Sequence, residues 1–227
     1  MSTDFILQAV LAIVPVIFAI TLHETAHGWA ALALGDTTAR DQGRLTLNPL
    51  KHIDRMGTII LPGLLLITQL LTIHKVAFMF GWAKPVPVSA WKFPNPRRYM
   101  AIVALAGPAM NFFLVWVTAL ALRGLADADT GAWLSTVLFD FMLVNMVLGL
   151  FNLLPIPPLD GGRVLVGLLP EPLARSWAGL ERYGLIIVLV CILVLPNVLG
   201  INPINDALNV VLPKAFRLVF WLAGYHE

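Results

Sequence analysis

Long apolar runs dominate this chain and restrict its fold more than any other feature. The first run continues from Phe5 to Leu22 without a charged side chain, and about 20 such residues cross a bilayer as a helix. The apolar runs along the sequence are Phe5 to Leu34, Gly57 to Ile73, Met100 to Leu122, Ala132 to Leu159, Tyr183 to Ile204 and, more weakly, Ala207 to Ala223. The pattern predicts an all-α polytopic membrane protein with five to six transmembrane helices.

The composition supports this prediction. Only 12% of the residues are charged, against about 25% in ordinary soluble domains. The basic residues behind the net charge of +2 cluster at the ends of apolar runs, where they set topology. We therefore expect the lipid bilayer, and no nucleic acid, as a partner. No loop is long enough for a separate soluble domain, so residues 1–227 are predicted to form a single membrane-embedded domain.

The distribution of basic residues also predicts an orientation. Arg40, Arg44, Lys51 and Arg55 follow the first apolar run, whereas only Asp4 precedes it. Loops rich in Lys and Arg stay in the cytoplasm. We expect a multi-pass protein of the cell membrane with its N-terminus outside and the loop after the first run in the cytoplasm.

The loops around the second apolar run do not fit a single crossing, which would place them on opposite sides of the membrane. The stretch that follows it is also basic, with Lys75, Lys84, Lys92, Arg97 and Arg98 and no acid among them. Both flanks can be cytoplasmic only if the stretch from Gly57 to about Val88 enters and returns. Pro85 and Pro87 disfavour helix at its end. We therefore expect a re-entrant, partly extended segment between the first and third apolar runs.

A metal-binding motif stands near the end of the first apolar run, at His23-Glu24-Thr25-Ala26-His27. On a helix, residues four apart lie one turn above the other on the same face, so both histidines can bind one Zn²⁺. Glu24 lies beside them and can take a proton from bound water. Ionisable side chains at membrane depth are costly and mark function. The motif predicts a zinc hydrolase.

A catalytic zinc usually needs a third protein ligand. Cys191, the only cysteine, lies within an apolar run, so the ligand must be a carboxylate or a histidine. The candidates are His52, Asp54, His74, Asp140 and Asp160. Only Asp160 and the two loop residues His52 and Asp54 share the expected depth of the histidines. Asp160 has the more distinctive setting, because prolines before it and glycines after it permit an unwound helix end and a sharp turn.

The motifs together resemble those of the site-2 proteases, which are intramembrane zinc metalloproteases (peptidase family M50). HETAH is similar to the family's HExxH, and the stretch from Asn152 to Gly161, NLLPIPPLDG, is similar to its second motif. Gly107-Pro108-Ala-Met-Asn111 resembles an element on the helix between them. GRLTLNPLKHID and GWAKPVPV resemble the small subgroup without PDZ or CBS domains.

The resemblance implies one Zn²⁺ per chain, held by His23, His27 and Asp160, with Glu24 as catalytic base. It further implies that Asn152 contacts the substrate backbone or the oxyanion, a role that Asn111 could share. The implied substrates are transmembrane proteins or peptides. Three alternatives remain open: the two asparagines serve only in helix packing, the chain is a membrane metal-ion transporter, or it is a non-catalytic relative that binds helices.

Overall fold

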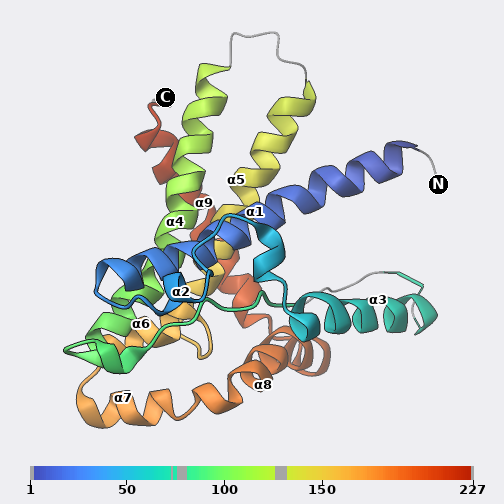
Figure 1. Ribbon diagram of the computed structural model, residues 1–227. Coiled ribbons are helices and arrows are strands. Elements are labelled where there is room, and N and C mark those ends of the chain that lie inside the picture. The colour runs from blue at the N-terminus through green and yellow to red at the C-terminus, as the bar shows by residue number, and fades with distance from the viewer. Residues whose placement is uncertain (1–2, 73, 76–80, 126–131, 226–227) are drawn as a thin grey trace.

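The computed structural model of the protein describes residues 3–72, 74–75, 81–125 and 132–225, and their side chains except those of residues 3–12 and 132. All regular elements within these ranges are helical, as predicted (Figure 1). The longer helices are α1 (Thr3–Ala33), α3 (Leu61–Thr72), α4 (Pro96–Gly124), α5 (Ala132–Asn152) and α9 (Pro203–Leu222). The shorter α-helices are α2 (Thr38–Asp41), α6 (Asp160–Leu168), α7 (Glu171–Ala178) and α8 (Gly184–Leu189). Single turns of 3₁₀-helix are η1 (Pro49–His52), η3 (Ala90–Lys92) and η4 (Glu181–Tyr183), and π-helix forms η2 (Arg55–Ile60) and η5 (Val190–Leu199).

Four helical stretches of the described residues are long and apolar enough to cross a membrane: Arg55–Thr72, Pro96–Gly124, Trp133–Asn152 and Glu171–Leu199. The chain is therefore an all-α, multi-pass membrane protein. This count leaves out α1, which begins in residues whose side chains are not described. The expected total of five to six transmembrane helices stays a prediction.

The core of the bundle lies between α4, α5 and α9. It contains Val115 and Ala119 of α4, Met142 and Met146 of α5, and Val219 of α9, all almost completely buried. In Figure 1, α4 and α5 run side by side, and α1 crosses them near their middle. α1 packs against both helices, and α6 packs against α4. The pair α4 and α5 thus forms the surface on which the other elements meet.

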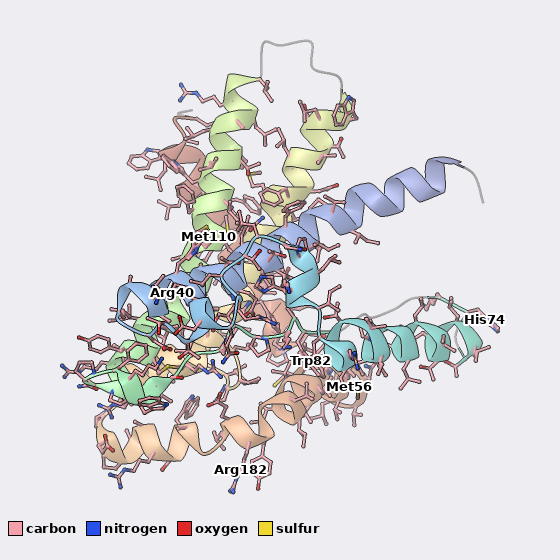
Figure 2. The ribbon with its side chains drawn as sticks, viewed as in Figure 1. Arg40, Met56, His74, Trp82, Met110 and Arg182 are labelled. Carbon is pink, nitrogen blue, oxygen red and sulfur yellow. The ribbon has the colours of Figure 1, made fainter. Side chains whose placement is uncertain are left out.

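The chain leaves the bundle at Gly57, runs along α3, and lies beside Gly57 again at Trp82. Trp82 N–H donates a hydrogen bond to the Gly57 carbonyl over 3.1 Å, and Thr58 Oγ1 donates one to the Trp82 carbonyl over 2.9 Å. Figure 2 shows Trp82 close to Met56 at the base of α3, whereas His74 lies at its outer end. A Cβ atom on Gly57 would overlap the Trp82 ring as it lies here, so the close return uses the space that glycine leaves.

The returning chain, residues 81–89, has no regular secondary structure and continues towards α1. These residues are called the extended segment. Arg44 donates a hydrogen bond to the Lys84 carbonyl over 2.8 Å, and the buried Asp36 carboxylate accepts one from Ser89 N–H over 2.6 Å. Both side chains come from the loop after α1. The extended segment is therefore held by the loop after α1, and between these two contacts its Val86 N–H donates a hydrogen bond to Glu24 of α1. How deep the segment lies in the bilayer stays a prediction.

Candidate metal centre

The HETAH motif lies on α1 where that helix crosses α4. The His23 and His27 rings meet edge to face with centroids 4.7 Å apart, and their Nε2 atoms are 3.1 Å apart. Gly107 of α4 lies directly behind the rings, since a Cβ atom there would lie 2.5 Å from His27 Nε2 and 2.6 Å from His23 Cε1. The one-turn spacing thus brings both imidazoles to one point, and the missing side chain at Gly107 makes room for them.

Asp160 reaches the same point from the start of α6. Its Oδ2 atom lies 3.1 Å from His23 Nε2 and 3.4 Å from His27 Nε2. The turn before α6 is tight, because a Cβ atom on Gly161 would overlap the Leu153 carbonyl oxygen. The glycine therefore lets the end of α5 pack across the first turn of α6. Sequence reasoning favoured Asp160 for this unwound setting, and the structure brings it to the histidines.

The three side chains present lone pairs to one another. His27 Nδ1 lies 2.7 Å from the Val103 carbonyl oxygen, which can only accept, so Nδ1 carries the proton and Nε2 is free. His23 Nδ1 lies 2.5 Å from Asn111 Oδ1. Asp160 Oδ2 is buried and receives no hydrogen bond within the described residues. Three converging acceptors repel one another unless a cation lies between them, and two His nitrogens with one Asp oxygen form a donor set that suits Zn²⁺.

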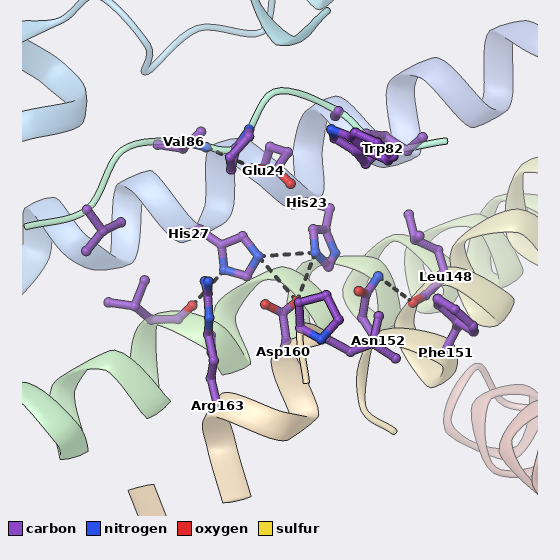
Figure 3. Close-up of a pocket in the computed structure, with 18 of the residues that line it drawn as sticks. His23, Glu24, His27, Trp82, Val86, Leu148, Phe151, Asn152, Asp160 and Arg163 are labelled. Carbon is purple, nitrogen blue, oxygen red and sulfur yellow. Dashed lines mark hydrogen bonds and ion pairs between the residues drawn. The ribbon is translucent and has the colours of Figure 1, made fainter. Parts of the chain in front are cut away.

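Glu24 lies beside this cluster without joining it. Its Oε2 atom accepts a hydrogen bond from Val86 N–H of the extended segment over 3.0 Å. The glutamate lines the same cavity as both histidines and Asp160. Figure 3 shows Glu24 and Val86 on the opposite side of the histidines from Asp160. The second carboxylate oxygen therefore stays available to a molecule in the cavity.

The cavity has a volume of about 640 Å³. Its walls come from α1, the extended segment, α4, the end of α5, α6 and α8, and most of its lining side chains are apolar. The polar groups thus gather at one place in a mainly apolar chamber, which is the usual composition of a small-molecule or peptide site.

The structure separates the two asparagines of the sequence motifs. Asn152 lines the cavity, and its Nδ2 donates to the Leu148 carbonyl of its own helix over 3.0 Å. Asn111 is completely buried and contacts His23 and Asn145 instead. A contact of Asn111 with substrate stays a prediction, while its observed contacts favour a role behind the histidine.

The other candidate ligands have partners or positions elsewhere. His52 is buried and its Nε2 lies 2.9 Å from the Thr46 carbonyl oxygen. Asp54 caps η2 through the backbone N–H groups of Met56 and Gly57, and His74 lies at the outer end of α3 (Figure 2). Within the described part of the chain, neither these three residues nor Asp140 belongs to the group formed by His23, His27 and Asp160, whose ligand atoms lie within 4.8 Å of one another.

Two contacts of the site were not foreseen from the sequence. The Val86 N–H that holds Glu24 is a backbone group, which no residue type marks. Asn145, which contacts Asn111, was visible as a polar residue within an apolar run. That isolated amide was the available signal, because polar side chains inside membrane helices normally have a partner.

The fold and the site define a helical membrane protein with a His, His and Asp cluster beside a glutamate. The sequence model of peptidase family M50 matches residues 121–195, which include Asn152 and Asp160. A Bacillus subtilis (strain 168) protein named "Putative zinc metalloprotease YwhC" is 39% identical over 186 residues, which cover 78% of each chain. A Mycolicibacterium smegmatis protein named "Putative zinc metalloprotease Rip2" is 31% identical over 217 residues, covering 95% of this chain and 74% of that one. No solved structure shows a significant match. The chain belongs to peptidase family M50, the site-2 protease family of intramembrane zinc metalloproteases.

Proposed function

We propose that residues 1–227 form one membrane-embedded protease domain that hydrolyses peptide bonds within or near transmembrane segments of other proteins. His23, His27 and Asp160 would together hold one Zn²⁺ per chain. The observation that carries this assignment is the convergence of two imidazole nitrogens and one unbonded carboxylate oxygen at one point of the cavity. When bound, Zn²⁺ supplies Lewis-acid activation of water and of the scissile carbonyl.

Glu24 would act as the general base. It lies next to His23 in sequence, lines the same cavity, and does not share the point where the three ligand atoms meet. Val86 N–H holds Oε2, so Oε1 can accept the proton of the attacking water and return it to the leaving amide nitrogen. Glu24 would thus move one proton between two atoms of the reacting groups without binding the metal.

Asn152 would contact the substrate. It is the asparagine that lines the cavity, at the end of α5, and its Nδ2 already donates to a backbone carbonyl. A small rotation would let the same amide donate to a substrate carbonyl or to the developing oxyanion. The mainly apolar lining favours transmembrane protein or peptide segments as substrates over soluble polar ones.

The first experiment compares Zn²⁺ content and cleavage of a transmembrane-helix reporter for the wild-type protein, Glu24→Gln and Asp160→Ala, purified in detergent. We expect about one Zn²⁺ per wild-type chain. Glu24→Gln should keep the metal and lose cleavage by about 10²- to 10⁴-fold, as expected on removing a general base. Asp160→Ala should lose metal affinity and cleavage together, because a ligand is missing.

The control is Glu171→Gln, which makes the same chemical change in a surface ion pair with Arg97 and Arg175 and should leave both readouts unchanged. If Glu24→Gln still cleaves the reporter, the base is assigned wrongly. If all variants bind Zn²⁺ equally and none cleaves, the roles proposed here fail and transport of metal ions becomes the better explanation.

A further inference from the structure

Two completely buried asparagines connect the metal centre to α5. His23 Nδ1 lies 2.5 Å from Asn111 Oδ1, and Asn111 Nδ2 donates to Asn145 Oδ1 over 2.8 Å. Asn145 Nδ2 in turn donates to the Phe141 carbonyl of its own helix over 2.8 Å. Both asparagine side chains have an exposed fraction of 0%. The two asparagines therefore link α1, α4 and α5 through hydrogen bonds while being themselves out of contact with solvent.

The hydrogen bond between Asn145 and the Phe141 carbonyl of α5 fixes the direction of the other two hydrogen bonds, those of Asn111 with Asn145 and with His23. The Phe141 carbonyl can only accept, so the Asn145 amide must present its NH₂ group to it and its oxygen to Asn111. Asn111 must then donate with Nδ2, which turns its own oxygen towards His23. That oxygen can only accept, so His23 Nδ1 has to carry the proton. His23 Nε2 is left with a free lone pair, which faces Asp160 and His27.

We propose that Asn111 and Asn145 are positioning residues that hold His23 in the one tautomer able to bind Zn²⁺ through Nε2. This inference rests on the proposed function, since it assigns a purpose to the tautomer. Partners that receive the second ring N–H of a metal-binding histidine orient the ring and raise metal affinity. Here the partner is the Asn111 amide, whose accepting oxygen and donating NH₂ group have a similar size and can exchange places. The hydrogen bond to Asn145 keeps the oxygen of Asn111 on the side of His23.

His27 shows why only one histidine depends on this arrangement. Its Nδ1 donates to the Val103 carbonyl, a backbone group of α4 that no side-chain substitution removes. α4 therefore orients both histidines, His27 through its main chain and His23 through Asn111. A role of the asparagines in helix packing alone would account for the contact between Asn111 and Asn145, but it leaves the contact of Asn111 with His23 without a purpose.

The test measures Zn²⁺ affinity by competition with a chelator, together with the visible spectrum of the Co²⁺-loaded protein, which reports ligand number and geometry. Asn111→Leu should weaken Zn²⁺ binding by about 10- to 100-fold, the usual effect of losing such a partner. Asn145→Leu, which does not touch the histidine, should weaken it less but in the same direction, because the Asn111 amide is then free to turn over. Both variants should alter the Co²⁺ spectrum.

Two further variants separate this role from structural damage. Asn111→Asp should bind Zn²⁺ better than Asn111→Leu, because a carboxylate accepts the His23 proton as the amide oxygen does. Asn197→Leu is the matched control: Asn197 Nδ2 also donates to a carbonyl four residues earlier in its helix, that of Leu193, yet its side chain is exposed. Its removal should leave Zn²⁺ affinity and the Co²⁺ spectrum unchanged.

Thermal unfolding of the metal-free proteins completes the comparison. A variant that is only destabilised should still gain the full rise in unfolding temperature when Zn²⁺ is added, whereas a variant in which His23 is no longer positioned should gain less. Wild-type affinity in Asn145→Leu would overturn the proposal, as would an Asn111→Asp protein no better than Asn111→Leu. If the wild-type protein itself binds no Zn²⁺, the proposed function fails first, and that result is distinct from a failure of the positioning role of the two asparagines.

Discussion

At the scale of single residues, the metal centre depends as much on an absent side chain as on its ligands. Gly107 lets α4 approach so closely that a Cβ atom would overlap both histidine rings. His23 and His27 cannot move away, because their Nδ1 atoms are held by groups on the same helix, Asn111 and Val103. The Gly-Pro-x-x-Asn element thus combines two functions: the glycine admits the rings and the asparagine orients one of them.

Gly107→Ala is therefore expected to lower Zn²⁺ affinity and cleavage together, by about 10- to 100-fold, because displacing the rings disturbs the ligands as much as losing their partners would. The measurement is chelator competition beside the reporter assay. Gly63→Ala in α3 is the matched control, since a Cβ atom there meets nothing within 4 Å, and it should leave both values unchanged. Full Zn²⁺ affinity in Gly107→Ala would show that the rings have more room than the structure gives them.

At the scale of elements, the extended segment is fixed by a buried carboxylate. Asp36 accepts hydrogen bonds from Thr38 N–H over 2.9 Å and from Ser89 N–H, and lies 3.0 Å from Lys92 Nζ. Burial by itself raises the pKa of Asp36, but these hydrogen bonds outweigh it and hold the pKa at about 2. The negative charge thus ties the loop after α1 to the segment whose Val86 N–H contacts Glu24.

The lowered pKa of Asp36 predicts how stability depends on pH. Because the folded pKa lies below the unfolded one, the contribution is complete above about pH 5 and is lost as pH falls towards 2, and it amounts to about 2 kcal/mol. Asp36→Asn should lower the unfolding temperature at neutral pH and show a smaller further fall on acidification than the wild-type protein. Asp41→Asn, which alters an exposed carboxylate on the same loop, should change the unfolding temperature little. Equal acid sensitivity of Asp36→Asn and the wild-type protein would contradict this assignment.

At the scale of the whole molecule, the parts of the fold that the sequence predicts are those set by periodicity and composition. Long apolar runs predict the membrane helices, and the basic flanks of Gly57 to Val88 predict the return of that segment. The setting of Asp160 predicts its approach to the histidines. Two contacts of the site could not be predicted from the sequence. Val86 contacts Glu24 through its backbone N–H, which no residue type marks. The contact of Asn111 with Asn145 depends on how α4 is rotated against α5, which the sequence alone does not determine.

The orientation of the molecule in the membrane is the last expectation that the basic loops support. The loop after α1 is rich in Arg and Lys, so it should face the cytoplasm together with the metal centre, and the N-terminus should lie outside. The end of α4 at Gly124 lies at the opposite end of that helix from α6 (Figure 1). Single cysteines in a Cys191→Ser background, labelled in intact cells by a reagent that cannot cross the membrane, distinguish the two sides.

We expect Gly124→Cys to react in intact cells, because a side chain there meets open space. Lys51→Cys and Arg175→Cys, both at exposed positions, should react only after the membrane is opened. An epitope tag before residue 1 should be accessible from outside. The opposite labelling pattern would place the metal centre on the outer side, and substrates would have to present their cleavage site there. The positive charge of the loops would then not reflect a cytoplasmic location.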